Sequence, residues 1–184
     1  RTVDPSAFVL DMGQNLAGFP EITVRGRKGQ KITLLVSESL SDEGACNQRQ
    51  TGRQHYYEYT LKGEGVETWH PRFSYYGFRY IQVEGAVLKG QKNTLHLPVI
   101  QKIQSCFVYN SAPKVSTFQC SNRIFNEAHR LIEKAVRSNM QSVFTDCPHR
   151  EKLGWLEQDH LCGPGLLYNY DLTGFLPQTL QNIA

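Results

Sequence analysis

Hydrophobic and polar residues alternate in short runs over the first hundred residues of the chain. Glycine-rich turn segments separate these runs, for example at Gly26-Arg-Lys-Gly29 and Lys62-Gly-Glu-Gly65. Alternating runs at a spacing of roughly ten residues are typical of an antiparallel β-sandwich. The strands that this pattern predicts cover residues 19–24, 31–36, 56–59, 78–83 and 95–100.

The period of the apolar positions becomes helical after residue 120. The residues that share one helical face are Ile124, Ala128, Leu131 and Ala135. They predict an amphipathic helix from about residue 121 to 142, with Ser121 or Asn122 as its N-cap. A second helix is expected over about 158–168, shortened by Gly163-Pro-Gly165, and a third from about residue 174.

The change of period predicts a domain boundary near residues 109–116, with a β-sandwich over 1–110 and a helical part over 111–184. Three helices are too few to enclose a sizeable core of their own. The chain also starts at Arg1, without an initiator Met, and stops within a helix-like stretch. We therefore expect both ends to be cut and the helical part to belong to a larger domain.

Composition and charge remove several classes of function. The 184 residues are 40% hydrophobic, so a globular fold is expected. Twenty Lys and Arg residues against 17 Asp and Glu give a net charge of +3, and the basic residues are scattered. No apolar run approaches the roughly 20 residues that a membrane span needs. Neither nucleic acid nor a membrane is therefore expected as a partner.

The five cysteines occur at irregular spacing and include no CxxC pair, which favours neither a disulfide framework nor a zinc ribbon and leaves the cellular compartment open. Cys147-x-His149 and His160-x-Cys162 could together offer four zinc ligands, but gaps of one residue are shorter than usual. We predict no metal and no cofactor.

Acidic side chains gather between the first two predicted helices, at Asp146, Glu151, Glu157 and Asp159, together with Arg150 and Trp155. Glu151 precedes Trp155 by four residues, so one helical turn would set the carboxyl group against the indole and raise its pKa, as a general acid requires. Glycosidic bond cleavage uses two such carboxyl groups and an aromatic surface for the sugar. A structural network of ion pairs and caps is the alternative that the residues leave open.

The run Asp146-Cys-Pro-His-Arg-Glu-Lys-Leu-Gly-Trp155 resembles the signature Asp-Cys-Pro-x-Arg-Glu-x-x-Gly-Trp of bacterial α-L-rhamnosidases of glycoside hydrolase family 78. Leu10–Gly18 and Pro71–Tyr80 resemble the β-sandwich of the same enzymes. The resemblance implies a multi-domain fold in which an antiparallel β-sandwich precedes the first helices of an all-α (α/α)6 barrel, truncated here.

The same resemblance implies roles for individual residues. Glu151 becomes the general acid of an inverting hydrolysis of terminal α-L-rhamnosides, and Asp146, Arg150 and Trp155 become rhamnose-binding residues. The family continues Gly-Trp-x-Gly-Asp, whereas this chain has Gly154-Trp-Leu-Glu-Gln-Asp159. Either Asp159, which we assign to substrate binding, or Glu157 could supply that acidic contact.

The general base is expected beyond Ala184, so the 184 residues alone are expected to be inactive. The expected partners are rhamnose-containing glycosides or polysaccharides and the remainder of the same polypeptide. The alternative to the enzyme is a non-catalytic carbohydrate-binding or structural β-sandwich module.

Overall fold

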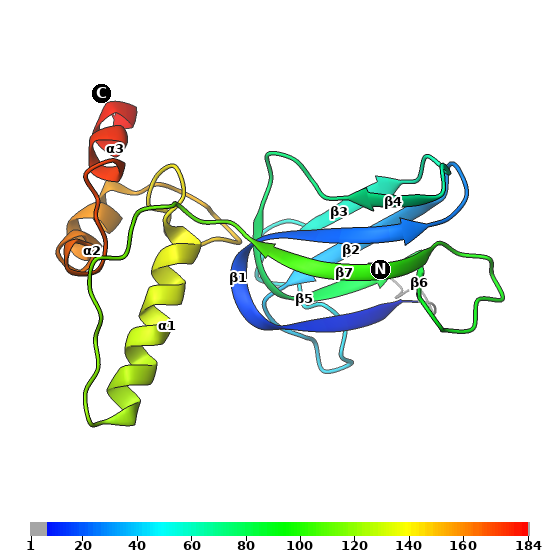
Figure 1. Cartoon of the computed structure of the whole chain (residues 1–184), viewed down its shortest axis with the longest axis horizontal. Coiled ribbons are helices and arrows are strands. Elements are labelled where there is room, and N and C mark those ends of the chain that lie inside the picture. Colours follow the sequence, from blue (N-terminus) through cyan, green and yellow to red (C-terminus); the bar gives the residue numbers. More distant parts are fainter. Residues whose placement is uncertain (1–6, 184) are drawn as a thin grey trace. The chain divides into compact units, whose positions relative to one another are not determined.

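The computed structural model describes residues 7–183, and the chain divides after Phe107 into two compact units. The predicted domains begin at residue 1 and end at residue 184, which lie outside the described residues. The first unit contains strands β1 (Phe8–Arg25), β2 (Lys31–Ser37), β3 (Tyr56–Thr60), β4 (Val66–Trp69), β5 (Tyr76–Glu84), β6 (Val87–Leu88) and β7 (Val99–Phe107). The second contains helices α1 (Arg123–Asn139), α2 (Leu156–Asn169) and α3 (Phe175–Ile183) (Figure 1).

Strand β1 connects the two halves of the sheet. Its first part, from Phe8 to Gly18, pairs antiparallel with β5, and its second part, from Gly18 to Arg25, pairs antiparallel with β7. β4 pairs with Ile22–Arg25, so the end of β1 has a neighbour on each side. The described strands form one hydrogen-bonded sheet in the order β3-β2-β5-β1-β7-β6, in which only the β6–β7 pair is parallel.

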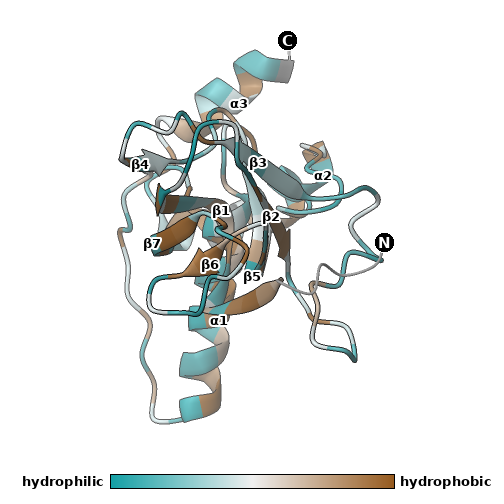
Figure 2. Cartoon of the chain, turned by 90° about the vertical axis from the view of Figure 1, so that its right-hand side faces the viewer, coloured by the Kyte–Doolittle hydropathy of each residue, from teal (hydrophilic) through white to brown (hydrophobic). Residues whose placement is uncertain are grey.

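Both halves of the sheet contribute to one hydrophobic core. The buried members are Ile22, Val24, Ile32, Leu34, Val36, Tyr57, Leu61, Phe78, Ile81, Val83, Ala86 and Ile100. Ile22 and Ile100 come from the half formed with β7, whereas Leu34 and Ile81 come from the half formed with β5. The sheet therefore folds on itself around this core, and Figure 2 shows hydrophobic stretches on its strands. The predicted order of a β-sheet domain followed by helices is confirmed.

Local side-chain contacts explain where the strands differ from their predicted positions. β1 runs for 18 residues because its pairing with β5 shifts register between Asp11 and Leu16, which accommodates Gly13 with a φ of +83°. The strand expected over 95–100 is instead a turn up to Pro98, because the Asn93 side chain both donates to and accepts from the backbone of Leu97 at 2.8 and 2.9 Å. β7 begins only at Val99. β4 and β6, at 4 and 2 residues, were too short to predict.

The helices begin near their expected positions and differ in length. The Asn122 side chain caps α1 by accepting from the Ile124 amide at 2.9 Å, which confirms it as N-cap. α1 ends at Asn139, three residues before the predicted end. The prediction that Gly163-Pro-Gly165 shortens α2 is wrong, since the helix continues to Asn169 with Pro164 inside it. No group crowds the two glycines, so the backbone can adjust around the proline ring.

The second unit has a small core of its own, formed by Met140, Phe144, Leu166, Tyr170, Leu172 and Phe175. It joins the end of α1 to α2 and to the start of α3. The charged face of α1 contacts the preceding segment, where Lys114 pairs with Glu133 and Arg137 lies over the Tyr109 ring at 4.9 Å. The apolar stripe of α1, including Ile124 and Leu131, is exposed within this unit.

The connection between β3 and β4 is organised by a buried carboxylate. Glu67 accepts hydrogen bonds from the Tyr59 hydroxyl at 2.5 Å and from the amides of Lys62 and Gly63 at 2.9 and 2.8 Å. Burial acts to raise the pKa of Glu67, but these three hydrogen bonds and one from the Glu64 backbone outweigh it and leave the pKa below its ordinary value. Burial and the hydrogen bond to Glu67 raise the pKa of Tyr59 to about 12.

We expect Glu67→Gln to lower the free energy of unfolding by about 1–3 kcal/mol at neutral pH, because it weakens charge-assisted hydrogen bonds to buried donors. Since the folded-state pKa is depressed, the stabilisation is present above the unfolded pKa and is lost as the pH falls through the folded value. Urea unfolding should therefore show a smaller loss of stability between about pH 5 and pH 3 in the variant than in the native protein. Glu64→Gln, at an exposed position of the same turn, is the matched control. If acid lowered the free energy of unfolding equally in the native protein and in Glu67→Gln, Glu67 would not be the residue whose titration destabilises the fold.

Candidate functional site

The segment between α1 and α2 forms a loop that is closed by Asp146. The Asp146 amide donates to the Leu153 carbonyl at 3.0 Å, and the Leu153 amide donates back to Asp146 Oδ1 at 3.0 Å. The Cys147 amide donates to the same carboxylate oxygen at 2.7 Å. A single acidic side chain thus satisfies two backbone donors and holds the two ends of the loop together.

The loop begins with a tight turn over residues 148–151. Pro148 restricts the backbone at the start of this turn, and the Glu151 amide donates to Cys147 Sγ at 3.3 Å. Lys152 then has φ +56°, and residues 152–155 are not helical. The prediction that one helical turn carries both Glu151 and Trp155 is therefore wrong, because the left-handed backbone at Lys152 ends the turn.

Three of the predicted site residues come together within this loop. Glu151 Oε1 accepts from Arg150 Nη2 at 2.6 Å and from Arg150 Nε at 3.1 Å. The Glu151 side chain also hydrogen-bonds with Asp146. Arg150 and Glu151 remain 55% and 37% exposed, so water screens the ion pair and it contributes little to stability.

Burial acts to raise the pKa of Asp146, but hydrogen bonds from the Leu153 amide, the Glu151 side chain and Cys147 outweigh it and lower the pKa. The hydrogen bonds from the Leu153 and Cys147 amides favour the ionised form of Asp146. On its other side the Glu151 carboxyl group is contacted by the Arg150 guanidinium.

The remaining two predicted residues belong to the start of α2. Trp155 is the N-cap residue of this helix, and its side chain is 50% exposed. Asp159 lies in the first turn, where burial raises its pKa and Oδ1 is buried without a hydrogen-bond partner among residues 7–183. Glu157 in the same turn is exposed. Of the two acids left open by the sequence, Asp159 is therefore the one with a sequestered carboxyl group.

Cys147 is a contact residue that the sequence reasoning assigned no role. Its amide binds Asp146, its sulfur accepts from Glu151, and its side chain also hydrogen-bonds with the Asp146 carboxyl group. A polar side chain directly before a proline, four residues ahead of an acid, has the position of an N-cap. That spacing was the available signal, and it is weak because sulfur is a poor acceptor.

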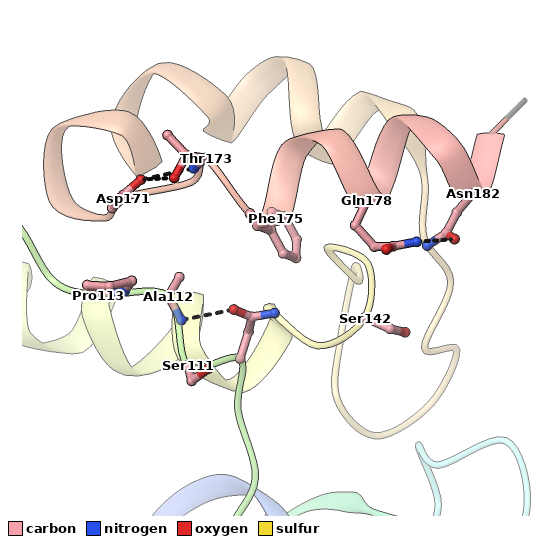
Figure 3. A pocket seen from close by; sticks show the side chains of 11 residues that line it. Ser111, Ala112, Pro113, Ser142, Asp171, Thr173, Phe175, Gln178 and Asn182 are labelled. Carbon is pink, nitrogen blue, oxygen red and sulfur yellow. Dashed lines mark hydrogen bonds between the residues drawn. The ribbon is translucent and has the colours of Figure 1, made fainter.

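The second unit also has a hollow of about 610 Å³ that is separate from this cluster (Figure 3). Its lining includes Asp171, Thr173, Gln178 and Asn182, whereas none of the predicted site residues lines it. The Asp171 carboxylate accepts from the Thr173 hydroxyl at 2.7 Å, and Gln178 donates to Asn182 at 3.2 Å. These lining groups are thus engaged with each other, and Figure 3 shows both contacts.

Over residues 7–183, no three His, Cys, Asp or Glu side chains are grouped so that they could hold a metal ion. Cys147-x-His149 and His160-x-Cys162 are thus not assembled into a four-ligand site. No helix in that range is long and apolar enough to cross a bilayer.

Comparison with known proteins gives the same family for both units. Residues 1–109 match the model of the bacterial α-L-rhamnosidase concanavalin-like domain, and residues 113–184 match that of the bacterial α-L-rhamnosidase six-hairpin glycosidase domain. An α-L-rhamnosidase of Formosa agariphila is 32% identical over 182 residues, which is 96% of this chain and 18% of the relative.

Solved structures are similar over nearly the whole chain. An α-L-rhamnosidase from Dictyoglumus thermophilum aligns with a TM-score of 0.83 and 33% identity, over 98% of this chain and 20% of that one. The Streptomyces avermitilis α-L-rhamnosidase complexed with L-rhamnose aligns with a TM-score of 0.80 and 33% identity, over 95% of this chain and 16% of that one. The chain therefore spans about a fifth or less of the length of these relatives.

We expect Asp146→Ala to loosen the loop, because the amides of Cys147 and Leu153 lose their acceptor, at a cost of about 1–3 kcal/mol. Asp146→Asn keeps a carbonyl oxygen at this position and should have a smaller effect. Hydrogen exchange followed on a peptide spanning residues 146–155 in the full-length protein should be at least about tenfold faster in Asp146→Ala. Asp171→Ala, which removes the acceptor of the Thr173 amide elsewhere in the unit, is the control. Unchanged exchange in Asp146→Ala would refute the role of this carboxylate in closing the loop.

Proposed function

We propose, on the premise that this chain belongs to the bacterial α-L-rhamnosidase family, that the intact protein hydrolyses terminal α-L-rhamnosides with Glu151 as the general acid. The observation that carries this proposal is the contact of the Glu151 carboxyl group with Asp146 on one side and Arg150 on the other. A general acid must hold a proton and then give it up. Within this proposal, Asp146 is the hydrogen-bond partner of Glu151 while the proton is held, and Arg150 pairs with the carboxylate that remains after the proton is transferred.

In the proposed reaction Glu151 transfers its proton to the glycosidic oxygen as the bond between that oxygen and the anomeric carbon breaks. A water molecule attacks the anomeric carbon from the opposite face and passes a proton to a second carboxylate. In an inverting enzyme the two carboxyl groups are separated by roughly 6.5–9.5 Å so that this water fits between them. Asp146 is hydrogen-bonded to Glu151 and is too close to be the base. The base therefore has to come from elsewhere in the intact protein, and we place it beyond Ala184.

The proposed sugar contacts are Asp146, Arg150, Trp155 and Asp159. The exposed indole of Trp155 offers an apolar surface for the C–H groups of the deoxyhexose. Asp159 Oδ1 is buried and has no hydrogen-bond partner within the described chain, and a sugar hydroxyl that reaches it would supply the missing hydrogen bond. Asp159 therefore takes precedence over Glu157 as the acidic contact that follows the tryptophan.

The acid role predicts that Glu151→Gln depends on the leaving group. In the full-length protein we expect turnover of a rhamnoside with an alkyl leaving group to fall by at least about 100-fold, because this oxygen needs a proton to depart. Turnover of p-nitrophenyl α-L-rhamnoside should fall much less, since nitrophenolate departs without help. Glu157→Gln, at an exposed acid nearby, serves as the matched control. Native turnover of the alkyl rhamnoside by Glu151→Gln would remove Glu151 from the acid role.

The binding role predicts that Trp155→Ala raises KM for p-nitrophenyl α-L-rhamnoside by about tenfold, with a smaller change in kcat, because the ring contacts the sugar in both ground and transition states. Trp155→Phe keeps part of the aromatic surface, so its KM should lie between the values of the native protein and of Trp155→Ala. Leu156→Ala, at the adjacent exposed position, should leave KM unchanged. A normal KM in Trp155→Ala would argue against a sugar-binding indole.

A further inference from the structure

We propose that Cys147 is a positioning residue for the general acid, in which one thiol group fixes Glu151 relative to Asp146. This inference rests on the proposed function, because it assigns to Cys147 a role in the reaction that Glu151 performs. The Cys147 side chain contacts both acids, while proton transfer itself is the role of Glu151.

The amide and the side chain of Cys147 are both directed at the two acids. The sulfur accepts the Glu151 amide at 3.3 Å, and the amide of Cys147 donates to Asp146 Oδ1 at 2.7 Å. The side chain of Cys147 also forms a hydrogen bond with the Asp146 carboxyl group. The thiol therefore acts as donor toward one acid and as acceptor toward the backbone of the other.

This double use sets the position of the Glu151 backbone. Pro148 restricts the turn at its start, and the hydrogen bond from the Glu151 amide to the sulfur closes it three residues later. The Glu151 side chain then extends from a fixed point toward Arg150 and Asp146. Without the sulfur, the turn before Lys152 loses the contact that closes it, and the Glu151 carboxyl group can move relative to the glycosidic oxygen.

A thiol suits this position because it is neutral, small and able to donate and accept at once. A hydroxyl group has the same two capacities in a slightly smaller volume. A valine side chain fills the space of the thiol but can neither donate nor accept. A comparison of serine and valine variants at position 147 therefore separates the effect of the hydrogen bonds of Cys147 from the effect of its volume.

The consequence for catalysis follows from the geometry of proton transfer. A misplaced acid slows departure of a leaving group that needs its proton, and slows departure of a stable phenolate far less. Loss of general structure in the loop, by contrast, would also move Asp146, Arg150 and Trp155 and would impair both kinds of substrate and their binding. The ratio of turnover on the two substrates thus distinguishes positioning of the acid from structural damage.

The experiment uses the full-length protein with Cys147→Val, Cys147→Ala and Cys147→Ser, assayed on an alkyl α-L-rhamnoside and on p-nitrophenyl α-L-rhamnoside. We expect Cys147→Val and Cys147→Ala to lower kcat on the alkyl rhamnoside by about tenfold, with less than about a threefold change on the nitrophenyl substrate and an unchanged KM. Cys147→Ser should recover kcat on the alkyl substrate to within about threefold of the native protein.

Cys162→Ala is the matched control, because this thiol belongs to the same unit but packs against the core of α2 and α3. It should leave both substrates unaffected. If Cys147→Ala does not fold, the comparison of Cys147→Ser with Cys147→Val decides the question alone. Equal losses on both substrates, native turnover in Cys147→Val, or a serine variant as impaired as the valine variant would each overturn the proposal.

The result is separable from the test of the proposed function. If Glu151→Gln shows the dependence on the leaving group and Cys147→Val does not, only the positioning role fails. If Glu151→Gln shows no such dependence, the acid assignment fails first and the assignment of Cys147 fails with it.

Discussion

The carboxylate of Asp146 is the constraint on which the candidate site depends. It accepts the amides of Cys147 and Leu153, and so it joins the two ends of a loop that has no regular secondary structure to hold it. Backbone donors that lose their acceptor cost free energy, so an acidic side chain at this position has a structural reason that is independent of chemistry. The same hydrogen bonds, together with the one from the Glu151 side chain, lower the pKa of the Asp146 carboxyl group.

For the residues of this loop, a structural role and the proposed catalytic role are therefore compatible. From the residues alone, a network of caps and ion pairs competed with a catalytic cluster, and the structure contains features of both. Asp146 closes the loop and also contacts Glu151, while Arg150 pairs with Glu151 in a position exposed to solvent. An exposed ion pair contributes little to folding, and in the proposed reaction Arg150 pairs with the charge that Glu151 acquires after proton transfer.

The two units differ in how much of their apolar surface they bury. In the first, β1 pairs with β5 and then with β7, so that one continuous sheet encloses a core of twelve buried side chains. In the second, only the end of α1 joins a small core, and its apolar stripe, including Ile124 and Leu131, is exposed. The relatives are about five times longer than this chain.

The sequence by itself determined the order of a β-sheet unit and helices, the N-cap at Asn122 and the family, because periodicity, capping and a ten-residue motif are local properties. Only the tertiary structure decided that the chain turns at Lys152, which separates Glu151 from Trp155 and leaves the carboxyl group beside Asp146 and Arg150. It also decided that Cys147 contacts both acids. These contacts depend on backbone angles and on groups several residues apart that meet only when the loop closes, and residue spacing does not encode that closure.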